Sequence, residues 1–333
     1  MKLLQMKIQT QYSNQPTHLD LLREMTKRGA LDNTAEWQEE FARLEKGVQG
    51  EQDALAFLQK FGEPHWTVLQ NVWLNYYGEF EVDIMVFTRS GIYTFEVKNY
   101  SGLLEYETHQ CKLNGRIIGQ NPFSQTQKAA ANLNGILGRE VRSVLLFIGE
   151  HNTVQVKESI AGIQVLARSQ FQQFIWQMAQ DERRYAGYPL DIDTALEVLH
   201  PHEIGKATRE TIIPNELKQH LRKGIGCCHC GSFEVVVGKV YIKCKCGLHE
   251  SRQEAIVRTI CEYGVIFSDR ELRTAEVSAF FGKVVSRKTV SRYLNHYFER
   301  IGTHKGTEYI NKCLPYEKLS ADFQFKKKKH LIL

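Results

Sequence analysis

The chain has 333 residues, of which 42% are hydrophobic and 24% are charged, and it contains only 7 prolines. This composition excludes a largely disordered or fibrous protein and leaves room for a core domain of about 150 to 200 residues with smaller modules. The longest clean apolar run, residues 144–148, is far shorter than the roughly 18 residues that cross a bilayer, and the N-terminal residues lack the apolar core of a signal peptide. We therefore expect a globular, cytoplasmic protein with no membrane span.

The positive charge of the chain is concentrated near its C-terminal end. Residues 251–333 contain 16 Lys and Arg against 9 Asp and Glu, whereas residues 1–250 contain 27 against 29. A local excess of positive charge favours a polyanionic partner. The lysine run at residues 326–329 is expected to be a solvated tail or to add unspecific attraction to phosphates.

Helical spacing of apolar residues marks the N-terminal part of the chain. Residues 18–46 predict a helical hairpin with a turn near residues 29–33. A further helix is expected to begin after Gly47 and Gly50, with Glu51 on its first turn.

Segments rich in β-branched and aromatic residues follow, and they predict strands. The expected strands are residues 66–74, 78–87, 91–99, 141–149 and 160–167, and the expected helices are residues 121–137 and 170–180. This order predicts a mixed α/β domain over residues 47–180.

Polar side chains interrupt two of these strands. Because strand side chains alternate between faces, Glu96 and Lys98 share one face, about 6 to 7 Å apart. A turn near Ser90 could bring Asp83 close to Glu96 across the hairpin. Two carboxylates held together repel each other unless a cation lies between them, and oxygen ligands suit Mg²⁺ or Mn²⁺. A surface ion pair of Glu96 with Lys98 is the alternative, since this tripeptide pattern is common.

Four motifs occur in a fixed order along this region: GVQGE with Glu51, EVDIMV with Asp83, FEVKNYSG with Glu96 and Lys98, and QNPFSQ with Asn121, Pro122 and Gln125. In this order they resemble the nuclease-related domain, NERD, of the PD-(D/E)XK nuclease superfamily. The resemblance covers about residues 47–167 and implies a restriction-endonuclease-like mixed sheet flanked by helices. The usual Pro-Asp pair of the superfamily is Val82-Asp83 here, which keeps the acidic residue.

The resemblance implies metal-dependent hydrolysis of phosphodiester bonds. The ligands of Mg²⁺ or Mn²⁺ would be Asp83, Glu96 and the backbone carbonyl of Val97. Lys98 would orient or help to deprotonate the attacking water and stabilise the transition state. Glu51 would complete the metal shell through water, and Gln125 would hold substrate or a ligand.

Five of the 8 cysteines lie within a short segment of the chain, which favours metal binding over disulfides in a cytosolic protein. Two Cys-Gly loops separated by a strand-like segment with a turn at Gly238 are typical of a zinc ribbon. The expected ligands of a structural Zn²⁺ are Cys227, Cys230, Cys244 and Cys246.

Other ligand sets remain open at this cluster. The second loop is one residue shorter than C-x-x-C, so Cys228, His229 or His249 could replace one of the four cysteines. Unliganded core thiols and a redox cysteine pair are further alternatives, although the redox pair lacks the surrounding fold pattern.

The C-terminal quarter predicts a winged helix-turn-helix. Residues 252–264 would form the first helix, residues 272–298 two more helices with Ser286 as N-cap of the last, and residues 299–311 the wing. The polar face of the last helix carries Arg287, Lys288, Ser291, Arg292 and Asn295, residue types that contact phosphates and base edges. The alternative is an ordinary three-helix packing unit.

The expected organisation comprises six segments. They are a helical hairpin (residues 1–46), a NERD-like domain (47–180), a helical linker (181–225), a zinc ribbon (226–250), a DNA-binding helix-turn-helix (251–315) and a basic tail (316–333). We predict a metal-dependent nuclease that acts on DNA. The alternatives are a DNA-binding regulator or scaffold with an inactive nuclease-like domain, and an RNA-processing nuclease.

Overall fold

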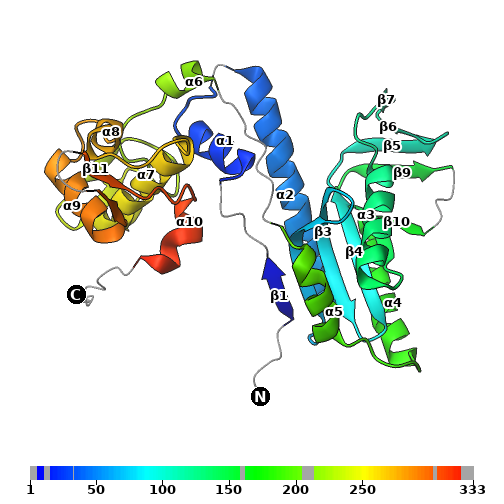
Figure 1. Ribbon diagram of the computed structural model, residues 1–333. Coiled ribbons are helices and arrows are strands. Elements are labelled where there is room, and N and C mark those ends of the chain that lie inside the picture. Colours follow the sequence, from blue (N-terminus) through cyan, green and yellow to red (C-terminus); the bar gives the residue numbers. More distant parts are fainter. Residues whose placement is uncertain are drawn as a thin grey trace. The chain divides into compact units, whose positions relative to one another are not determined.

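The structure, a computed structural model, describes residues 6–10, 16–32, 34–157, 162–204, 214–302 and 306–323 (Figure 1). The chain divides into two compact units. The first unit comprises Met1–Tyr12 and Arg43–Ala207, and the second comprises Ser13–Ala42 and Thr208–Leu333. Within the described residues, no helix is long and apolar enough to cross a membrane.

A six-stranded mixed sheet forms the core of the first unit. Strands β2, β3 and β4 are antiparallel neighbours, whereas β1 pairs with β2, β8 with β4 and β10 with β8 in parallel. In spatial order the strands are β1 (Lys7–Thr10), β2 (Thr67–Asn75), β3 (Glu79–Thr88), β4 (Gly91–Lys98), β8 (Arg142–Phe147) and β10 (Ile163–Ala167). The predicted mixed α/β class is confirmed.

Helices cover both faces of this sheet (Figure 1). Helices α2 (Ala35–Phe61) and α4 (Arg168–Arg184) pack against one face, in a cluster that includes Phe95 and Val97. Helices α3 (Pro122–Leu137) and α5 (Ile192–Leu199) pack against the other face. Alternation along β4 therefore sends Tyr93, Phe95 and Val97 toward α2 and α4, whereas Ile92 and the polar Thr94 and Glu96 lie on the side of α3.

A second, four-stranded sheet lies in the first unit and was not predicted from the sequence. Its spatial order is β7 (Arg116–Ile117), β6 (Gln110–Leu113), β5 (Gly102–Glu107) and β9 (Asn152–Val156). The turn between β6 and β7 contains Asn114 and Gly115, with φ angles of 52° and 77°. An Asn-Gly pair is the preferred centre of a tight hairpin, so this signal was present in the sequence.

Helix α2 is continuous, so the predicted start of a new helix after Gly47 and Gly50 is wrong. A glycine inside a helix costs about 1 kcal/mol relative to alanine. At Gly50, however, an added Cβ would lie 2.7 Å from Asn99 Cβ and 3.1 Å from Ile148 Cγ2. Gly50 therefore serves close packing of the helix against the sheet, and the predicted domain boundary at residue 46 falls within the helix.

Part of the predicted linker, residues 181–225, packs on the first unit. Ala195 and Leu199 of α5 are buried in the cluster that α3 forms with the sheet. The backbone N–H of Ile204 donates to the carbonyl oxygen of Trp73 at 2.9 Å. The i, i+4 spacing of the two buried residues was the sequence signal for this amphipathic helix.

The second unit contains helices and two small antiparallel sheets. Its helices are α1 (His18–Lys27), α6 (Asn215–Gln219), α7 (Arg252–Ile266), α8 (Thr274–Phe280), α9 (Arg287–Tyr297) and α10 (Tyr316–Leu319). One sheet contains β11 (Val235–Val237), β12 (Tyr241–Cys244) and β13 (His249–Ser251), and the other contains β14 (Arg300–Ile301) and β15 (Glu308–Tyr309). The lysine run at residues 326–329 lies outside the described residues.

Several local predictions in the second unit are confirmed. The Ser286 side chain caps α9 by accepting from the backbone N–H of Thr289 at 3.3 Å. Gly282 begins the turn before α9 with a φ angle of 61°. The backbone N–H of Gly238 donates to the carbonyl oxygen of Tyr241 at 2.9 Å, which closes the predicted turn between β11 and β12.

Buried charges hold α1 in the second unit. Arg28 follows α1, is only 1% exposed, pairs with Glu262 of α7 and donates to the carbonyl oxygen of Arg222 at 2.8 Å. Arg258 of α7 also pairs with Glu262 and donates to the carbonyl oxygen of Gly226 at 2.8 Å. The two arginines thus tie α7 to the backbone just before the first cysteine loop.

Candidate functional site

The ladder between β3 and β4 ends beside Asp83. The last paired residues toward this end are Ile84 and Phe95. Beyond them, Oδ2 of Asp83 accepts a hydrogen bond of 2.8 Å from the backbone N–H of Val97. Because a strand residue directs its N–H and C=O to the same neighbour, the Val97 carbonyl also faces the side of Asp83. The side chain of Glu96, the preceding residue, is 5% exposed.

The Lys98 ammonium lies between Glu96 and Gln125. Its Nζ is 2.6 Å from Oε1 of Glu96 and 3.3 Å from Oε1 of Gln125. The Asn121 side chain caps α3, and Pro122 occupies the first helical position. The predicted motif at residues 121–125 therefore fixes the start of α3 and directs Gln125 toward Lys98.

Electrostatics distinguish this cluster from an ordinary surface ion pair. Burial raises the pKa of Asp83 well above its usual value, and Glu96 and Glu51 raise it further. Burial also raises the pKa of Glu96, against the opposite effect of Lys98. For Lys98, burial acts to lower the pKa, but Glu96 and Asp83 outweigh burial and raise it. Two partly or fully buried carboxyl groups beside a single ammonium thus differ from a solvent-exposed ion pair.

Glu51 belongs to this cluster although its predicted position in the helix was wrong. It lies in the middle of α2 and not on a first turn. The close contact of Gly50 with Asn99 holds this part of α2 against the segment that follows β4. The charge of Glu51 raises the pKa of Asp83.

Glu81 is a further acidic neighbour, which was not predicted. It raises the pKa values of both Asp83 and Glu96. Glu81 and Asp83 are two residues apart on β3. The acidic alternation in the segment EFEVD was the signal that could have identified Glu81.

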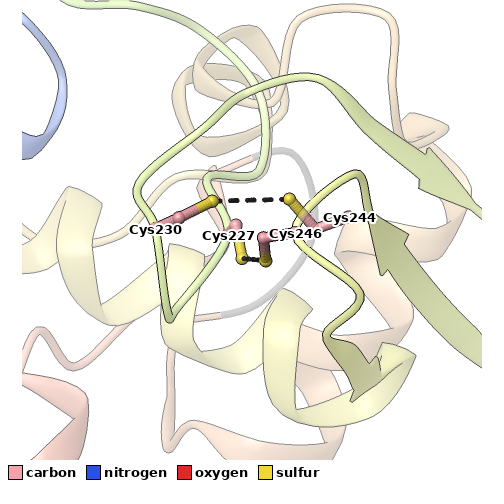
Figure 2. A group of neighbouring side chains, drawn as sticks. All are labelled: Cys227, Cys230, Cys244 and Cys246. Carbon is pink, nitrogen blue, oxygen red and sulfur yellow. Dashed lines mark hydrogen bonds between the residues drawn. The ribbon is translucent and has the colours of Figure 1, made fainter.

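The four predicted cysteine ligands form a compact cluster (Figure 2). The Sγ atoms of Cys227 and Cys246 are 3.7 Å apart, those of Cys230 and Cys244 are 3.5 Å apart, and all four lie within 4.8 Å of one another. Sulfurs at about 2.3 Å from a central Zn²⁺ would be about 3.8 Å apart in a tetrahedron. The cluster therefore has the dimensions of a metal site, the only such group of three or more ligands in the described part of the chain.

Backbone geometry supports the thiolate form of Cys227, whereas at Cys244 and Cys246 backbone hydrogen bonds act to lower the pKa but burial and neighbouring cysteines raise it. Gly231 and Gly247, which follow the second cysteine of each loop, have φ angles of 70° and 90°, a region that favours glycine. Burial acts to raise the pKa of Cys227, but hydrogen bonds from the backbone N–H groups of Cys230 and His229 contribute to lowering it to about 7. The tight turn after Cys230 thus accompanies backbone amides directed toward the sulfur of Cys227.

The alternative ligands do not belong to the compact group among the described residues. Burial and the nearby Glu250 raise the pKa of Cys228 to about 11, which disfavours its thiolate. His229 and His249 also lie outside the group. The geometry therefore favours the four cysteines first predicted.

The residues predicted to contact DNA are divided between two surfaces of α9. Arg287, Lys288 and Ser291 line a groove of about 820 Å³ with Arg273, Thr274, Ala275, Gly306, Thr307 and Glu308. Arg292 and Asn295 line a second depression with Gln253, Tyr293, His296 and Tyr297. Four of the five predicted residues are exposed, and Ser291 is half-buried.

The comparisons with known proteins identify one domain. The family model of the nuclease-related domain, NERD, matches residues 46–148. The matched span contains Glu51, Asp83, Glu96, Lys98 and Gln125. The match supports a nuclease-related function for this part of the chain. No curated protein and no solved structure matches the chain.

Proposed function

We propose that the first unit is a nuclease that hydrolyses DNA phosphodiester bonds with a divalent metal ion. The observation that carries this proposal is the hydrogen bond between Asp83 and Val97 where the β3–β4 ladder ends. Together with the contact of Lys98 with Glu96, it supports a site built from two carboxylates, a backbone carbonyl and Lys98. The NERD match over the same residues supports a nuclease-related function.

The donor atoms at this place fit Mg²⁺ or Mn²⁺. Asp83, Glu96 and Val97 would hold the ion through oxygen atoms, which hard divalent cations prefer, and so small a protein set leaves positions for waters and phosphate oxygens. Burial raises the pKa values of both carboxyl groups, with a further effect of Glu96 and Glu51 on Asp83, and a bound cation would favour the ionised forms. When bound, such an ion polarises a phosphoryl oxygen and lowers the pKa of a water. Glu51, whose charge raises the pKa of Asp83, would take part through water.

Lys98 is the residue best suited to stabilise negative charge on the reacting phosphate. Its raised pKa keeps the ammonium charged at neutral pH, which favours electrostatic stabilisation over proton abstraction. Glu96 and Gln125 orient the ammonium from two sides. The exposed Gln125 can also donate its amide N–H to a phosphate oxygen or a water.

We also propose that the second unit binds DNA and so concentrates substrate near the first unit. Three helices followed by a β-hairpin, with a β-bridge from Leu272 to Tyr309, are consistent with a winged helix-turn-helix. The net positive charge of this part and the exposed cations of α9 support the proposal. A tethered binding module raises the effective concentration of a weakly binding catalytic domain.

Salt-dependent DNA binding tests this module. Lys288→Ala should weaken binding to duplex DNA of any sequence and reduce the salt slope of the affinity by about 0.9. Lys239→Ala, at an exposed lysine of the β11–β12 turn, is the matched control and should leave both quantities unchanged. Equal effects of the two substitutions would contradict a specific α9 surface, and tighter binding to structured RNA would favour the RNA-processing alternative.

Nicking of supercoiled plasmid tests the nuclease proposal. We expect wild type to nick plasmid in Mg²⁺ or Mn²⁺, and we expect Glu96→Ala and Lys98→Ala each to lose about 10²-fold or more of the rate. Glu140→Gln, which removes an exposed carboxylate elsewhere in the first unit, should behave as wild type. Equal activity in all four preparations would point to a contaminant. No nicking with either metal would favour a DNA-binding regulator or scaffold.

A further inference from the structure

Lys46 of α2 is anchored beside the end of the proposed catalytic strand. Its Nζ donates to Oγ of Ser101 at 2.7 Å, and Nδ2 of Asn99 donates to its carbonyl oxygen at 2.8 Å. Asn99 and Ser101 follow directly after β4, which ends at Lys98. The side chain and the backbone of Lys46 each form one hydrogen bond, and both bonds connect Lys46 to the residues that directly follow β4.

Close packing keeps this part of α2 in place. Gly50, one helical turn after Lys46, allows the helix to approach Asn99 so closely that an added Cβ would lie 2.7 Å from Asn99 Cβ. Arg43 lies one turn before Lys46 and shares its side of the helix. Burial raises the pKa of Tyr100, and Lys98 and Arg43 both act to lower it, so Arg43 lies within electrostatic reach of the same segment.

Lys46 and Lys98 differ in whether a carboxylate pairs with the ammonium group. Lys98 pairs with Glu96 at 2.6 Å. Among the residues that the structure describes, the hydrogen-bond partner of the exposed Lys46 ammonium is the neutral Ser101 hydroxyl, and no carboxylate forms an ion pair with it. An ammonium has three donors, so two remain for another acceptor. The carboxylates of the site repel a polyanion, and a cation at its rim would offset that repulsion.

We infer that Lys46 binds a phosphate of the nucleic acid strand about two nucleotides from the phosphate that is cleaved. This inference rests on the proposed function and adds a substrate-binding residue to it. Lys46 and Glu51 are separated by about 7 Å along the helix axis. That distance corresponds to about two nucleotides at the rise of about 3.4 Å per nucleotide in a stacked strand. Ser101 orients the ammonium, and Asn99 ties the backbone at Lys46 to the strand that carries the reacting groups.

Binding of a short oligonucleotide tests the Lys46 contact without requiring cleavage. The experiment uses the full chain with Arg287→Ala, Lys288→Ala and Arg292→Ala as background, so that the α9 surface contributes little. The affinity for a fluorescent single-stranded DNA of about 12 nucleotides is measured in Ca²⁺ at several salt concentrations. Lys46→Ala should weaken binding by about tenfold and reduce the salt slope by about 0.7, whereas Lys46→Arg should retain most of the affinity. Ser101→Ala, which removes the anchor alone, should weaken binding by a smaller factor.

Lys60→Ala is the matched control on the same helix. Lys60 is exposed, like Lys46, and lies near the other end of α2. Its substitution should change neither affinity nor salt slope. Equal effects at Lys46 and Lys60, or none at Lys46, would overturn the inference.

Plasmid nicking then separates this inference from the proposed function. A chain whose binding depends on Lys46 but which does not nick contradicts the proposed hydrolysis and leaves the Lys46 contact standing. A chain that nicks plasmid but binds independently of Lys46 contradicts the contact alone. In a chain that nicks, Lys46→Ala should raise KM by about the same factor as it weakens binding and change kcat little, since Lys46 does not touch the cleaved phosphate.

Discussion

The acidic site of the first unit and the cysteine cluster of the second unit differ in what the chain supplies. In the cluster, two loops bring four sulfurs within 4.8 Å of one another, so the side chains alone can complete a tetrahedral site. The proposed acidic site lies at the end of a strand ladder and would offer two carboxylates and a carbonyl. Any ion held there needs waters or phosphate oxygens to fill its shell. A closed site of this kind suits a structural role, and an open one suits chemistry on a substrate.

Loss of the metal from the closed cysteine site should have the largest effect on stability. We expect about one Zn²⁺ per chain by elemental analysis, because four thiolates match its preferred ligands. Cys246→Ser should lose the ion and unfold the region of β11 to β13, since metal binding of this kind supplies folding free energy. Hydrogen exchange of this region measures the loss.

Cys228→Ser is the control for that experiment. Cys228 lies outside the compact group, so its substitution should leave both the zinc content and the exchange protection unchanged. A chain that is folded throughout the second unit without metal would contradict the assignment.

A pair of glycines tests how the open site is built. Gly50→Ala should destabilise the first unit by about 1–3 kcal/mol and slow nicking, because its Cβ would overlap Asn99 and move α2 away from the site. At Gly47 an added Cβ would have no neighbouring atom within 4 Å, so Gly47→Ala should stabilise the helix by about 0.5–1 kcal/mol. Urea unfolding of both variants measures the difference. A Gly50→Ala protein as stable as Gly47→Ala would show that close packing does not position Glu51.

Glu24 is a buried carboxylate that belongs to neither the acidic site nor the cysteine cluster. It is 2% exposed, its Oε1 is 2.9 Å from Nζ of Lys27, and its Oε2 has no hydrogen-bond partner within the described residues. Burial, with a further effect of Glu262, raises its pKa from 4.5 to about 7. The folded state therefore binds this proton more tightly than the unfolded state, so stability falls as the pH rises from about 4.5 to 7.

Glu24→Gln should remove this pH-dependent cost. At pH 8 the substitution is expected to raise the free energy of unfolding of the second unit by about 1 kcal/mol, or up to about 3 kcal/mol if the full shift applies. At pH 4.5 and below the gain should be absent, because the carboxyl is then protonated when folded. Urea midpoints at the two pH values provide the measurement, and a gain of the same size at both would refute the raised pKa.

Features that depend on a few neighbouring residues were predictable. Ser286 caps α9 because its side chain needs only the N–H of Thr289, three residues away. The cysteine cluster follows from two short loops and a turn at Gly238, which leave the chain few ways to arrange the sulfurs. Face alternation along β4 likewise separates Val97 from Glu96.

Features that depend on distant residues were not predictable from local patterns. The continuity of α2 at Gly50 results from packing against Asn99, which is far away in the sequence. Arg28 and Glu262 are separated by 234 positions, so no local pattern shows that α1 belongs with the C-terminal part of the chain. The position of Glu81 beside two other carboxylates follows from the hairpin, and only its alternation with Asp83 is visible in the sequence.

The metal dependence of plasmid nicking by wild type and Asp83→Asn tests the central claim most directly. The substitution keeps the size of the side chain and removes one carboxylate from the proposed metal site, while the Val97 N–H can still be bound by the amide oxygen. We predict that wild-type nicking saturates with Mg²⁺ and disappears with a chelator, and that Asp83→Asn nicks at least about 10²-fold more slowly at saturating metal. Nicking that persists in the chelator, or an Asp83→Asn rate equal to wild type, would contradict the account.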